Sequence, residues 1–319
     1  MTMNRRRFLF RAAALGAFAA SVAAVPAHSQ TAKELRIGLQ KNGVILVARQ
    51  QKTIEKALEP LGVTVSWHEF QFGPPLLEAM NAGAIDFGTT GDAPPIFAQA
   101  ARADLYYIAA HGGSENAIIV PDASPVKTLA ELKGKKIALG KGSSAHSLLL
   151  AALEKAGLSF ADIQPVYLAP ADAGAAFARG DVDAWSIWDP YLASTEKQQP
   201  VRIIAASSNT TPALSFYLAN RPFTDKNPEI VTKVTNALAE ATAWTKSHPD
   251  EAAKLFSEAT NVPYDIQRKT VERTPFAISP VSSDIVAKQQ ATADRFYKLG
   301  LLPKPVTVGD IVWKWTPGS

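Results

Sequence analysis

The chain has 319 residues, of which 47% are hydrophobic, enough for two domains with ordinary cores. Its net charge of +4 comes from four arginines among the first 27 residues, because basic and acidic side chains balance in the remainder. Such a balance gives no electrostatic footprint for nucleic acid or an anionic membrane. The absence of cysteine excludes disulfides, thiolate metal sites, cysteine nucleophiles and a lipid-modified cysteine.

Residues 1–27 have the pattern of an export signal peptide. Arginines at the start precede an alanine-rich apolar run, and Val25-Pro-Ala27 provides small residues for cleavage. Asn4-Arg-Arg-Arg-Phe-Leu9 fits the twin-arginine pattern, with a Sec signal as the alternative. An uncleaved anchor is disfavoured because the run is poor in leucine and isoleucine, and no later stretch is long enough to span a bilayer. We expect a soluble periplasmic protein without a lipid anchor.

Strand and helix patterns alternate along the next hundred residues. Strands are predicted at 35–39, 63–70, 85–88, 105–109 and 117–120, and helices at 44–58, from 73, and at 91–101. Gly73-Pro-Pro75 can open a helix because proline is tolerated in the first turn, where its missing N–H costs nothing. The alternation predicts an α/β domain with a mostly parallel sheet.

A second unit of the same kind begins near Ser124. Strands are predicted at 136–139, 166–168, 182–187 and 203–205, with helices at 129–132, 147–155 and ending at 177. A return strand at 215–219 leads into helical runs at 231–246, 251–259 and 285–299, which we expect to pack onto the first unit. The predicted organisation is one lobe from 34–120 and 216–319 and a second lobe from 121–215.

The two units share a repeated motif. Gly83-Ala-Ile-Asp-Phe-Gly-Thr-Thr-Gly-Asp92 returns as Gly180-Asp-Val-Asp-Ala-Trp-Ser-Ile-Trp-Asp189, and each copy follows a helical pattern that ends at the glycine. Any α/β protein repeats strand, loop and helix, but here the loops repeat as well. Two lobes of one plan predict a ligand in the cleft between them.

Three loops join a predicted strand to a helix and could bind that ligand. They are Gln40-Lys-Asn-Gly43, Thr89-Thr-Gly-Asp92 and Lys141-Gly-Ser-Ser-Ala-His146. Ligands bind at such positions in open α/β sheets, where helix N-termini favour an anion. The candidate contacts are Gln40, Thr90, Gly91, Asp92, Ser143, Ser144, Ala145 and His146. The alternative is ordinary helix capping, or a surface position in the case of His146.

The second copy of the motif carries tryptophans in place of the threonine loop. Strand alternation predicts that Trp185 is a core residue and that Trp188 faces the cleft. Asp189 is predicted to cap a helix, to order donors in the cleft or to meet a cationic group on the ligand. No phosphate loop, complete Gly-x-Ser-x-Gly elbow or histidine pair with metal spacing is found, so no catalytic residue, metal or cofactor is expected.

At these loops the chain resembles the aliphatic sulfonate-binding proteins, the periplasmic receptors of a sulfonate-uptake ABC transporter. The resemblance covers nearly all of the chain after residue 27. The stretches that carry it are Arg36-Ile-Gly-Leu-Gln-Lys41, Gly88-Thr-Thr-Gly-Asp-Ala-Pro-Pro-Ile-Phe-Ala-Gln-Ala100, Lys141-Gly-Ser-Ser-Ala-His146, Asp162-Ile-Gln-Pro165, Pro170-Ala-Asp172, Asp183-Ala-Trp-Ser-Ile-Trp-Asp-Pro-Tyr191 and Ser215-Phe-Tyr-Leu-Ala219. Thr-Gly-Asp-x-Pro-Pro together with Gly-Ser-Ser-x-His is a specific combination.

The resemblance implies a type II periplasmic binding protein, with two Rossmann-like lobes joined by hinge strands. It implies a monomeric receptor that captures alkanesulfonates and delivers them to an inner-membrane ABC permease for sulfur acquisition. It also implies that Arg273 is a cation near the bound anion or the opposite lobe, with a surface ion pair as the alternative. A desulfinase has a similar fold but uses a cysteine, which this chain lacks, so we expect no enzymatic activity.

A sulfonate is a monoanion at any physiological pH and a weak acceptor, so neutral donors and helix dipoles suit it. Taurine, nitrate and sulfate esters are the alternative ligands. The chain departs from the family at Leu39, where tyrosine is common, and over residues 111–116. Both places border the expected cleft, so the sequence leaves the ligand's tail open.

Overall fold

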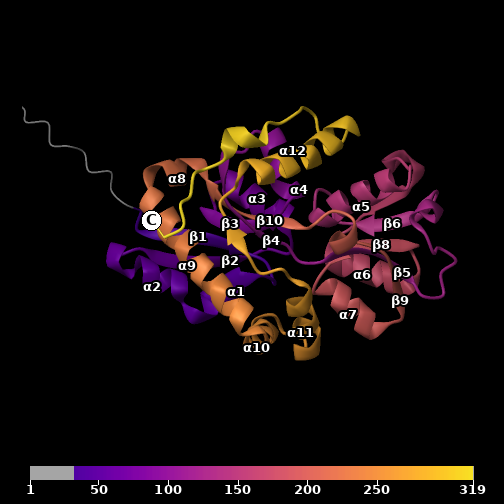
Figure 1. Cartoon of the computed structure of the whole chain (residues 1–319), viewed down its shortest axis with the longest axis horizontal. Coiled ribbons are helices and arrows are strands. Elements are labelled where there is room, and N and C mark those ends of the chain that lie inside the picture. The colour runs from indigo at the N-terminus through magenta and orange to yellow at the C-terminus, as the bar shows by residue number, and fades with distance from the viewer. Residues whose placement is uncertain (1–31, 319) are drawn as a thin grey trace, which may run out of the picture. The chain divides into compact units, whose positions relative to one another are not determined.

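The computed structural model describes residues 32–318, which contain two β-sheets (Figure 1). The expected signal peptide at 1–27 lies outside the described residues. The first sheet contains β1 (Glu34–Leu39), β2 (Thr64–Glu69), β3 (Phe87–Gly91), β4 (Leu105–Gly112), β10 (Leu214–Asn220) and β11 (Ile278–Ser279). The second contains β5 (Asn116–Pro121), β6 (Lys136–Leu139), β7 (Gln164–Tyr167), β8 (Ala184–Trp188) and β9 (Val201–Ala206).

The two sheets have matching strand orders, β2-β1-β3-β10-β4-β11 and β7-β6-β8-β5-β9. In each sheet three parallel strands are followed by one antiparallel strand, β10 in the first and β5 in the second. The chain crosses between the sheets at 113–115 and again at 207–213. This arrangement confirms the predicted two-lobe α/β fold of a type II periplasmic binding protein.

Strand pairing moves the predicted lobe boundaries. The sequence placed residues 116–120 in the first lobe, but β5 pairs with β8 through Asn116 and Trp188 and with β9 through Ala117 and Ala206. The second crossing ends at Leu214, where β10 begins to pair with β4. The alternation of apolar residues shows that 117–120 is a strand, but it carries no information about which sheet the strand joins.

Most helices belong to the first lobe. They are α1 (Val44–Gln51), α2 (Thr53–Leu58), α3 (Gly73–Asn81), α4 (Ala93–Ala100), α8 (Arg221–Lys226), α9 (Pro228–Ser247), α10 (Pro249–Thr260), α11 (Tyr264–Arg273) and α12 (Ser283–Lys298). The helix predicted over 44–58 is broken at Lys52, whose φ of 56° lies in the left-handed region. The second lobe has α5 (Ser144–Lys155), α6 (Pro170–Arg179) and α7 (Tyr191–Gln198).

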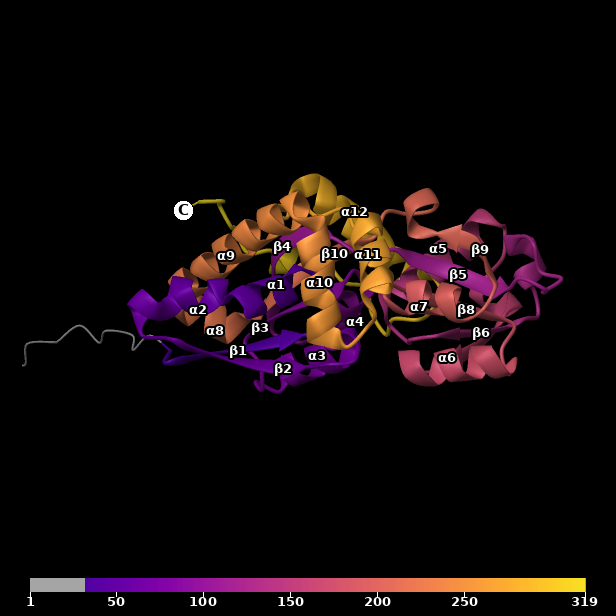
Figure 2. The same ribbon diagram turned by 90° about the horizontal axis from the view of Figure 1, so that it is seen from below.

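The C-terminal helices pack onto the first lobe, as predicted. Ile230, Val234 and Leu238 of α9 share one buried cluster with residues of β1 and α1, and Phe296 of α12 shares a second with Ile96 of α4. Figures 1 and 2 both show these orange-to-yellow helices with the first sheet and α5, α6 and α7 around the second. Within residues 32–318, no helix is both long and apolar enough to cross a membrane.

The repeated motif has a structural cause. Gly83 and Gly180 follow α3 and α6 with φ values of 72° and 77°, a left-handed conformation that glycine adopts without strain. Three residues later, Asp86 Oδ2 accepts a hydrogen bond from Arg36 N at 2.9 Å, and Asp183 Oδ2 accepts one from Lys136 N at 2.8 Å. Each aspartate thus holds the backbone of the equivalent strand of its sheet, β1 or β6, so the repeat marks two units of one plan.

Candidate functional site

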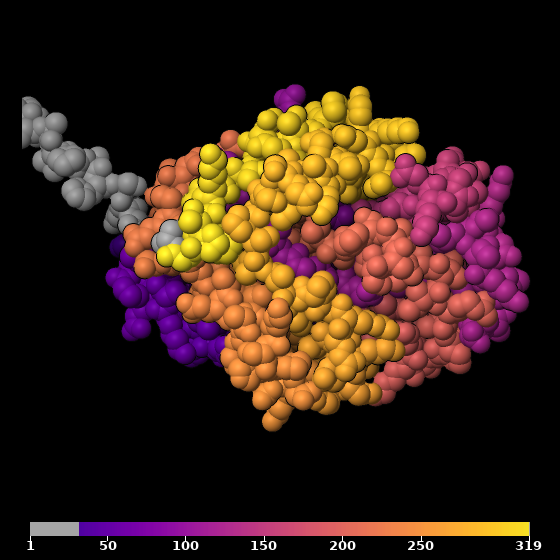
Figure 3. All heavy atoms as spheres, viewed as in Figure 1, coloured from indigo at the N-terminus to yellow at the C-terminus, as the bar shows by residue number. Residues whose placement is uncertain are grey.

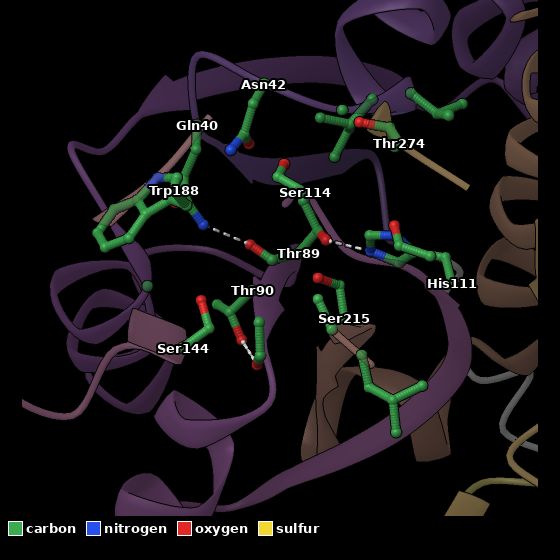
Figure 4. A pocket seen from close by; sticks show the side chains of 18 of the residues that line it. Gln40, Asn42, Thr89, Thr90, His111, Ser114, Ser144, Trp188, Ser215 and Thr274 are labelled. Atoms are coloured by element: carbon green, nitrogen blue, oxygen red, sulfur yellow. Dashed lines mark hydrogen bonds between the residues drawn. The ribbon is translucent and has the colours of Figure 1, made fainter. Parts of the chain in front are cut away.

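A pocket lies where β1, β3 and β4 end, and it takes residues from both lobes (Figure 4). Its polar lining comprises Gln40, Asn42, Thr89, Thr90, His111, Ser114, Asn116, Ser143, Ser144, Ser215, Tyr217, Thr270 and Thr274. Its apolar lining comprises Val44, Ile45, Phe72, Pro94, Trp188, Ala213, Leu214, Phe256, Phe276 and Ala277. Glycine backbone at residues 43, 73, 91 and 112 completes the wall.

No Asp, Glu, Lys or Arg is among these lining residues. The pocket's titratable side chains are His111, which is partly buried, and Tyr217, which is almost fully buried. Burial lowers the pKa of His111 to about 4 and raises the pKa of Tyr217, so both are neutral at pH 7. The lining side chains therefore offer a bound ligand hydroxyls, amides and aromatic rings, but no full charge.

Six of the predicted contacts line this pocket: Gln40, Thr90, Gly91, Ser143, Ser144 and Trp188. Ser143 is the N-cap of α5, because its Oγ accepts from His146 N at 3.4 Å and donates to Gly140 O at 2.7 Å. Ser144 begins α5, and its hydroxyl has no hydrogen-bond partner among the described residues.

The two lobes touch at Gly91 and Ser144. A Cβ atom at Gly91 would lie 2.8 Å from Ser144 Oγ, a distance that side chains do not adopt. Glycine at this position therefore permits the close approach of a first-lobe strand end to a second-lobe helix N-terminus.

His146 occupies neither of its predicted positions. It is not among the pocket residues, and it is 1% exposed, so it is not a surface histidine. Its Nδ1 accepts from Gly142 N at 3.2 Å, and its ring contacts Phe160 and Phe296, each at 5.1 Å between centroids. Burial lowers its pKa to about 4, so it is a neutral core residue. A histidine in the first turn of a helix gives no sequence signal of which way its ring turns.

Ala145 and Asp92 also lie outside the pocket lining. Ala145 is buried, and its carbonyl accepts a hydrogen bond from Ser186 Oγ at 2.8 Å. Asp92 precedes α4, and Gln289 Nε2 donates to its carbonyl at 2.7 Å. Its carboxyl group is buried, with no partner for Oδ1 within the described region, and burial raises its pKa to about 6.

Asp189 and Arg273 meet each other rather than the pocket. Asp189 is fully buried, and its Oδ1 accepts from Ala193 N at 2.9 Å in the first turn of α7, in keeping with the capping prediction. Arg273 Nη1 lies 3.4 Å from Asp189 Oδ1 and 2.8 Å from Glu196 Oε2. Burial raises the pKa of Asp189 to about 6, against the opposing effect of Arg273.

These ion pairs join the lobes, since Arg273 ends α11 in the first lobe and Glu196 belongs to α7 in the second. Lys269 adds a contact to Glu196 at 3.0 Å, and Lys197 one to Asp265 at 2.6 Å. Figure 3 shows the orange atoms of α11 against the salmon atoms of α7 on this face. The geometry agrees with the predicted bridge to the opposite lobe and not with a contact to the pocket.

Sequence reasoning missed several polar residues of the pocket, chiefly Thr89, His111, Ser114, Ser215, Thr270 and Thr274. Strand pairing sets His111 opposite Ser215, and the backbone of Gly112 meets Ala277 at 3.2 Å. Segments distant in sequence are thus brought together by pairing that local patterns do not encode. The poor match over 111–116 was the one available signal.

Fold and pocket define a binding protein of the two-lobe periplasmic type. The description of the family model that matches residues 71–252 is NMT1/THI5 like. A protein of Escherichia coli K12 is 43% identical over 314 residues, covering 97% of this chain and 98% of that protein. The chain belongs to the NMT1/THI5-like family.

Two solved structures are close in sequence and in fold. The periplasmic aliphatic sulphonate binding protein SsuA from Escherichia coli is 43% identical, with a TM-score of 0.81 over 91% of this chain and 94% of that one. The alkanesulfonate-binding protein SsuA from Xanthomonas axonopodis pv. citri, bound to MOPS, is 40% identical, with a TM-score of 0.83 over 89% and 99%. The expected resemblance to sulfonate-binding proteins is confirmed.

Proposed function

We propose that the chain is a periplasmic receptor that captures alkanesulfonates and delivers them to an ABC permease for sulfur acquisition. The names of the close relatives support this, and one observation in the pocket carries it. The lining contains free hydroxyls, amides and a helix N-terminus, but no ionised side chain. Neutral donors can hold a monoanion such as a sulfonate through charge-assisted hydrogen bonds.

The sulfonate group binds at the Gly91–Ser144 contact, with the Ser144 hydroxyl and the N-terminus of α5 as donors. Thr90 lines the same contact, but its hydroxyl already donates to Gly91 O at 3.0 Å. The apolar residues Val44, Ile45, Phe256 and Trp188 cover the tail. Because Gly91 and Thr90 belong to one lobe and Ser144 and Trp188 to the other, the ligand joins both lobes. Nitrate has no tail to fill the apolar part of the pocket. Taurine carries an ammonium group, which no lining carboxylate neutralises.

We propose binding without chemistry. The pocket histidine, His111, uses both ring nitrogens with Gly112 O and Thr89 Oγ1, so it is not positioned to activate Ser144. The receptor acts as a monomer in the periplasm, without nucleic acid or a cofactor. Export by the twin-arginine route is the preferred hypothesis for the leader, with Sec as the alternative.

Titration calorimetry with the protein lacking its leader tests the function. We expect alkanesulfonates to bind and to raise the melting temperature, because a ligand of the folded state stabilises it by mass action. Taurine, nitrate and sulfate should bind far more weakly. Tight binding of nitrate or taurine, with none of any alkanesulfonate, would assign the receptor to one of the alternative ligands.

A further inference from the structure

One wall of the pocket is built from hydroxyl groups whose protons are already used. Thr89 lies on β3 and His111 on β4, the strands on either side of β10, and Thr270 and Thr274 belong to α11. Figure 4 shows His111 and Thr274 on the same side of the pocket, with Thr89 turned toward His111. We call Thr89, His111, Thr270 and Thr274 the threonine wall.

The hydrogen bonds of His111 fix the direction of the Thr89 hydroxyl. His111 Nδ1 lies 3.0 Å from Gly112 O, and a carbonyl can only accept, so Nδ1 carries a proton. Because burial keeps the ring neutral at pH 7, Nε2 has a lone pair. Thr89 Oγ1, 2.8 Å away, must therefore donate to Nε2, and it turns lone pairs toward the pocket.

The hydroxyl protons of the two threonines of α11 are also used in hydrogen bonds. Thr270 Oγ1 donates to Ile266 O at 3.1 Å, and Thr274 Oγ1 donates to Thr270 O at 2.9 Å. By contrast, the hydroxyls of Ser114, Ser144 and Ser215 make no hydrogen bond within residues 32–318 and can donate freely. Outside the wall, Thr90 Oγ1 donates to Gly91 O at 3.0 Å and Ser143 Oγ donates to Gly140 O at 2.7 Å. The pocket thus contains two kinds of hydroxyl, those whose proton is already used and those of the three serines, which are free to donate.

This polarity discriminates between ligand tails. A methyl group against the threonine wall leaves buried acceptors without a donor, which weakens binding by about tenfold for one hydrogen bond lost. An ammonium group supplies a donor but must be desolvated without a counter-ion, since no carboxylate lines the pocket. An uncharged donor such as a hydroxyl satisfies the wall without that cost.

We propose that the pocket selects sulfonates whose tail carries an uncharged hydrogen-bond donor, of which a terminal hydroxyl is the simplest, over plain alkanesulfonates. The proposal rests on the sulfonate-receptor function and defines the substrate class of the same site. It also gives His111 a role. His111 directs the Thr89 hydroxyl, which contacts the ligand, so His111 is a positioning residue.

The test compares ligands of equal size by titration calorimetry. Propanesulfonate, hydroxyethanesulfonate and aminoethanesulfonate differ only in a terminal methyl, hydroxyl or ammonium group. The next two longer pairs of alkane- and hydroxyalkanesulfonates cover the unknown distance from the anion to the wall. At the length that reaches the wall, the hydroxyl ligand should bind about tenfold more tightly than its alkane partner. Equal affinities at every length would overturn the selectivity, whereas no binding of any sulfonate would reject the receptor function itself.

Two variants connect the selectivity to the wall. Thr89→Val keeps the shape of the side chain and removes its acceptor oxygen. The affinity for the hydroxyalkanesulfonate, divided by that for the alkanesulfonate of equal size, should therefore fall toward one. The control is Ser144→Ala, which removes a free donor at the anion contact and leaves the threonine wall intact. It should weaken both ligands and keep the ratio. A ratio that survives Thr89→Val would contradict the proposal.

His111→Phe provides a second route if Thr89→Val does not fold, as judged by its melting curve without ligand. Phenylalanine retains the ring contact with Tyr217, whose centroid lies 4.5 Å from that of His111. It removes the acceptor for Thr89, whose hydroxyl can then donate into the pocket. A sulfonate whose tail ends in an ether oxygen, which can only accept, should then gain affinity relative to the hydroxyl ligand. An unchanged ratio of these two affinities would show that His111 does not direct Thr89.

Discussion

Neighbouring serines at the start of α5 have different hydrogen bonds. Ser143 is held as the helix cap, whereas the hydroxyl of Ser144 faces the pocket without a partner in the described part of the chain. Capping and ligand binding, which the sequence could not separate, therefore fall on adjacent residues. This division allows each role to be tested with the other as its control.

Ser144→Ala should weaken sulfonate binding by about 1–3 kcal/mol, because it removes one charge-assisted hydrogen bond. The melting temperature of the empty protein should hardly change. Ser143→Ala should instead lower the stability of the empty protein by about 0.5–2 kcal/mol through loss of the cap. Calorimetry and melting curves measure both. Lost apo stability with intact affinity in Ser144→Ala would show that Ser144 serves the helix and not the ligand.

Asp92 predicts a pH-dependent stability difference. Burial raises its pKa from 3.8 to about 6, so its ionised form destabilises the fold above pH 6, and the penalty disappears as the pH falls toward 3.8. Asp92→Asn removes that penalty and should be more stable than the wild type by about 1–3 kcal/mol at pH 8, with the difference vanishing near pH 4. Denaturant unfolding across this range measures it. A difference that does not vary with pH would mean that the carboxyl group does not titrate as described.

At the scale of elements, two ionic links join the lobes within residues 32–318. One pairs Arg295 of α12 with Glu154 of α5 at 2.7 Å, and the larger is the contact between α7 and α11. It combines Arg273 with Asp189 and Glu196, and Lys269 and Lys197 extend it. These groups lie away from the pocket lining, so they can stabilise the closed arrangement without contacting ligand. Contacts that exist only when two bodies have met act mainly on the dissociation rate.

Arg273→Ala should therefore speed sulfonate release and leave association nearly unchanged. Stopped-flow tryptophan fluorescence, with Trp188 in the pocket as the reporter, measures both rates. Arg268→Ala is the matched control, because Arg268 lies on the same helix but pairs with Asp250 and Glu272 inside the first lobe. If the off-rate of Arg273→Ala equalled that of the control, the ion pairs would have no role in closure.

Sequence patterns predicted where strands and helices lie better than which strands pair with each other. Strand and helix periods located every strand except β11 and most helices, but not α7, α8 and α11. The loops at strand ends led to Thr90, Gly91, Ser144 and Trp188. They failed where pairing decides the outcome, as for β5, which joins the second sheet, and for Ser215, which β10 brings beside His111. Ring orientation was equally hidden, so His146 was predicted at the surface or the ligand and lies in the core.

At the scale of the whole molecule, the export route depends on residues that precede the described structure. Replacing Arg5 and Arg6 together by lysine should leave precursor in the cytoplasm if the leader is a twin-arginine signal. Fractionation and immunoblotting would detect it, with replacement of Lys52, outside the leader, as the control. Normal export of the double variant would indicate the Sec route.

The two crossings of the chain between the sheets, at 113–115 and 207–213, also set the order in which the two sheets can obtain all their strands during synthesis. All five strands of the second sheet lie within residues 116–206, whereas β10, which separates β3 from β4 in the first sheet, begins at Leu214. A growing chain that has emerged only as far as residue 206 carries every strand of the second lobe, but it leaves a vacant position in the middle of the first. The lobe encoded later can thus be finished earlier, and the first lobe must hold its strand edges unpaired until translation has passed two thirds of the gene.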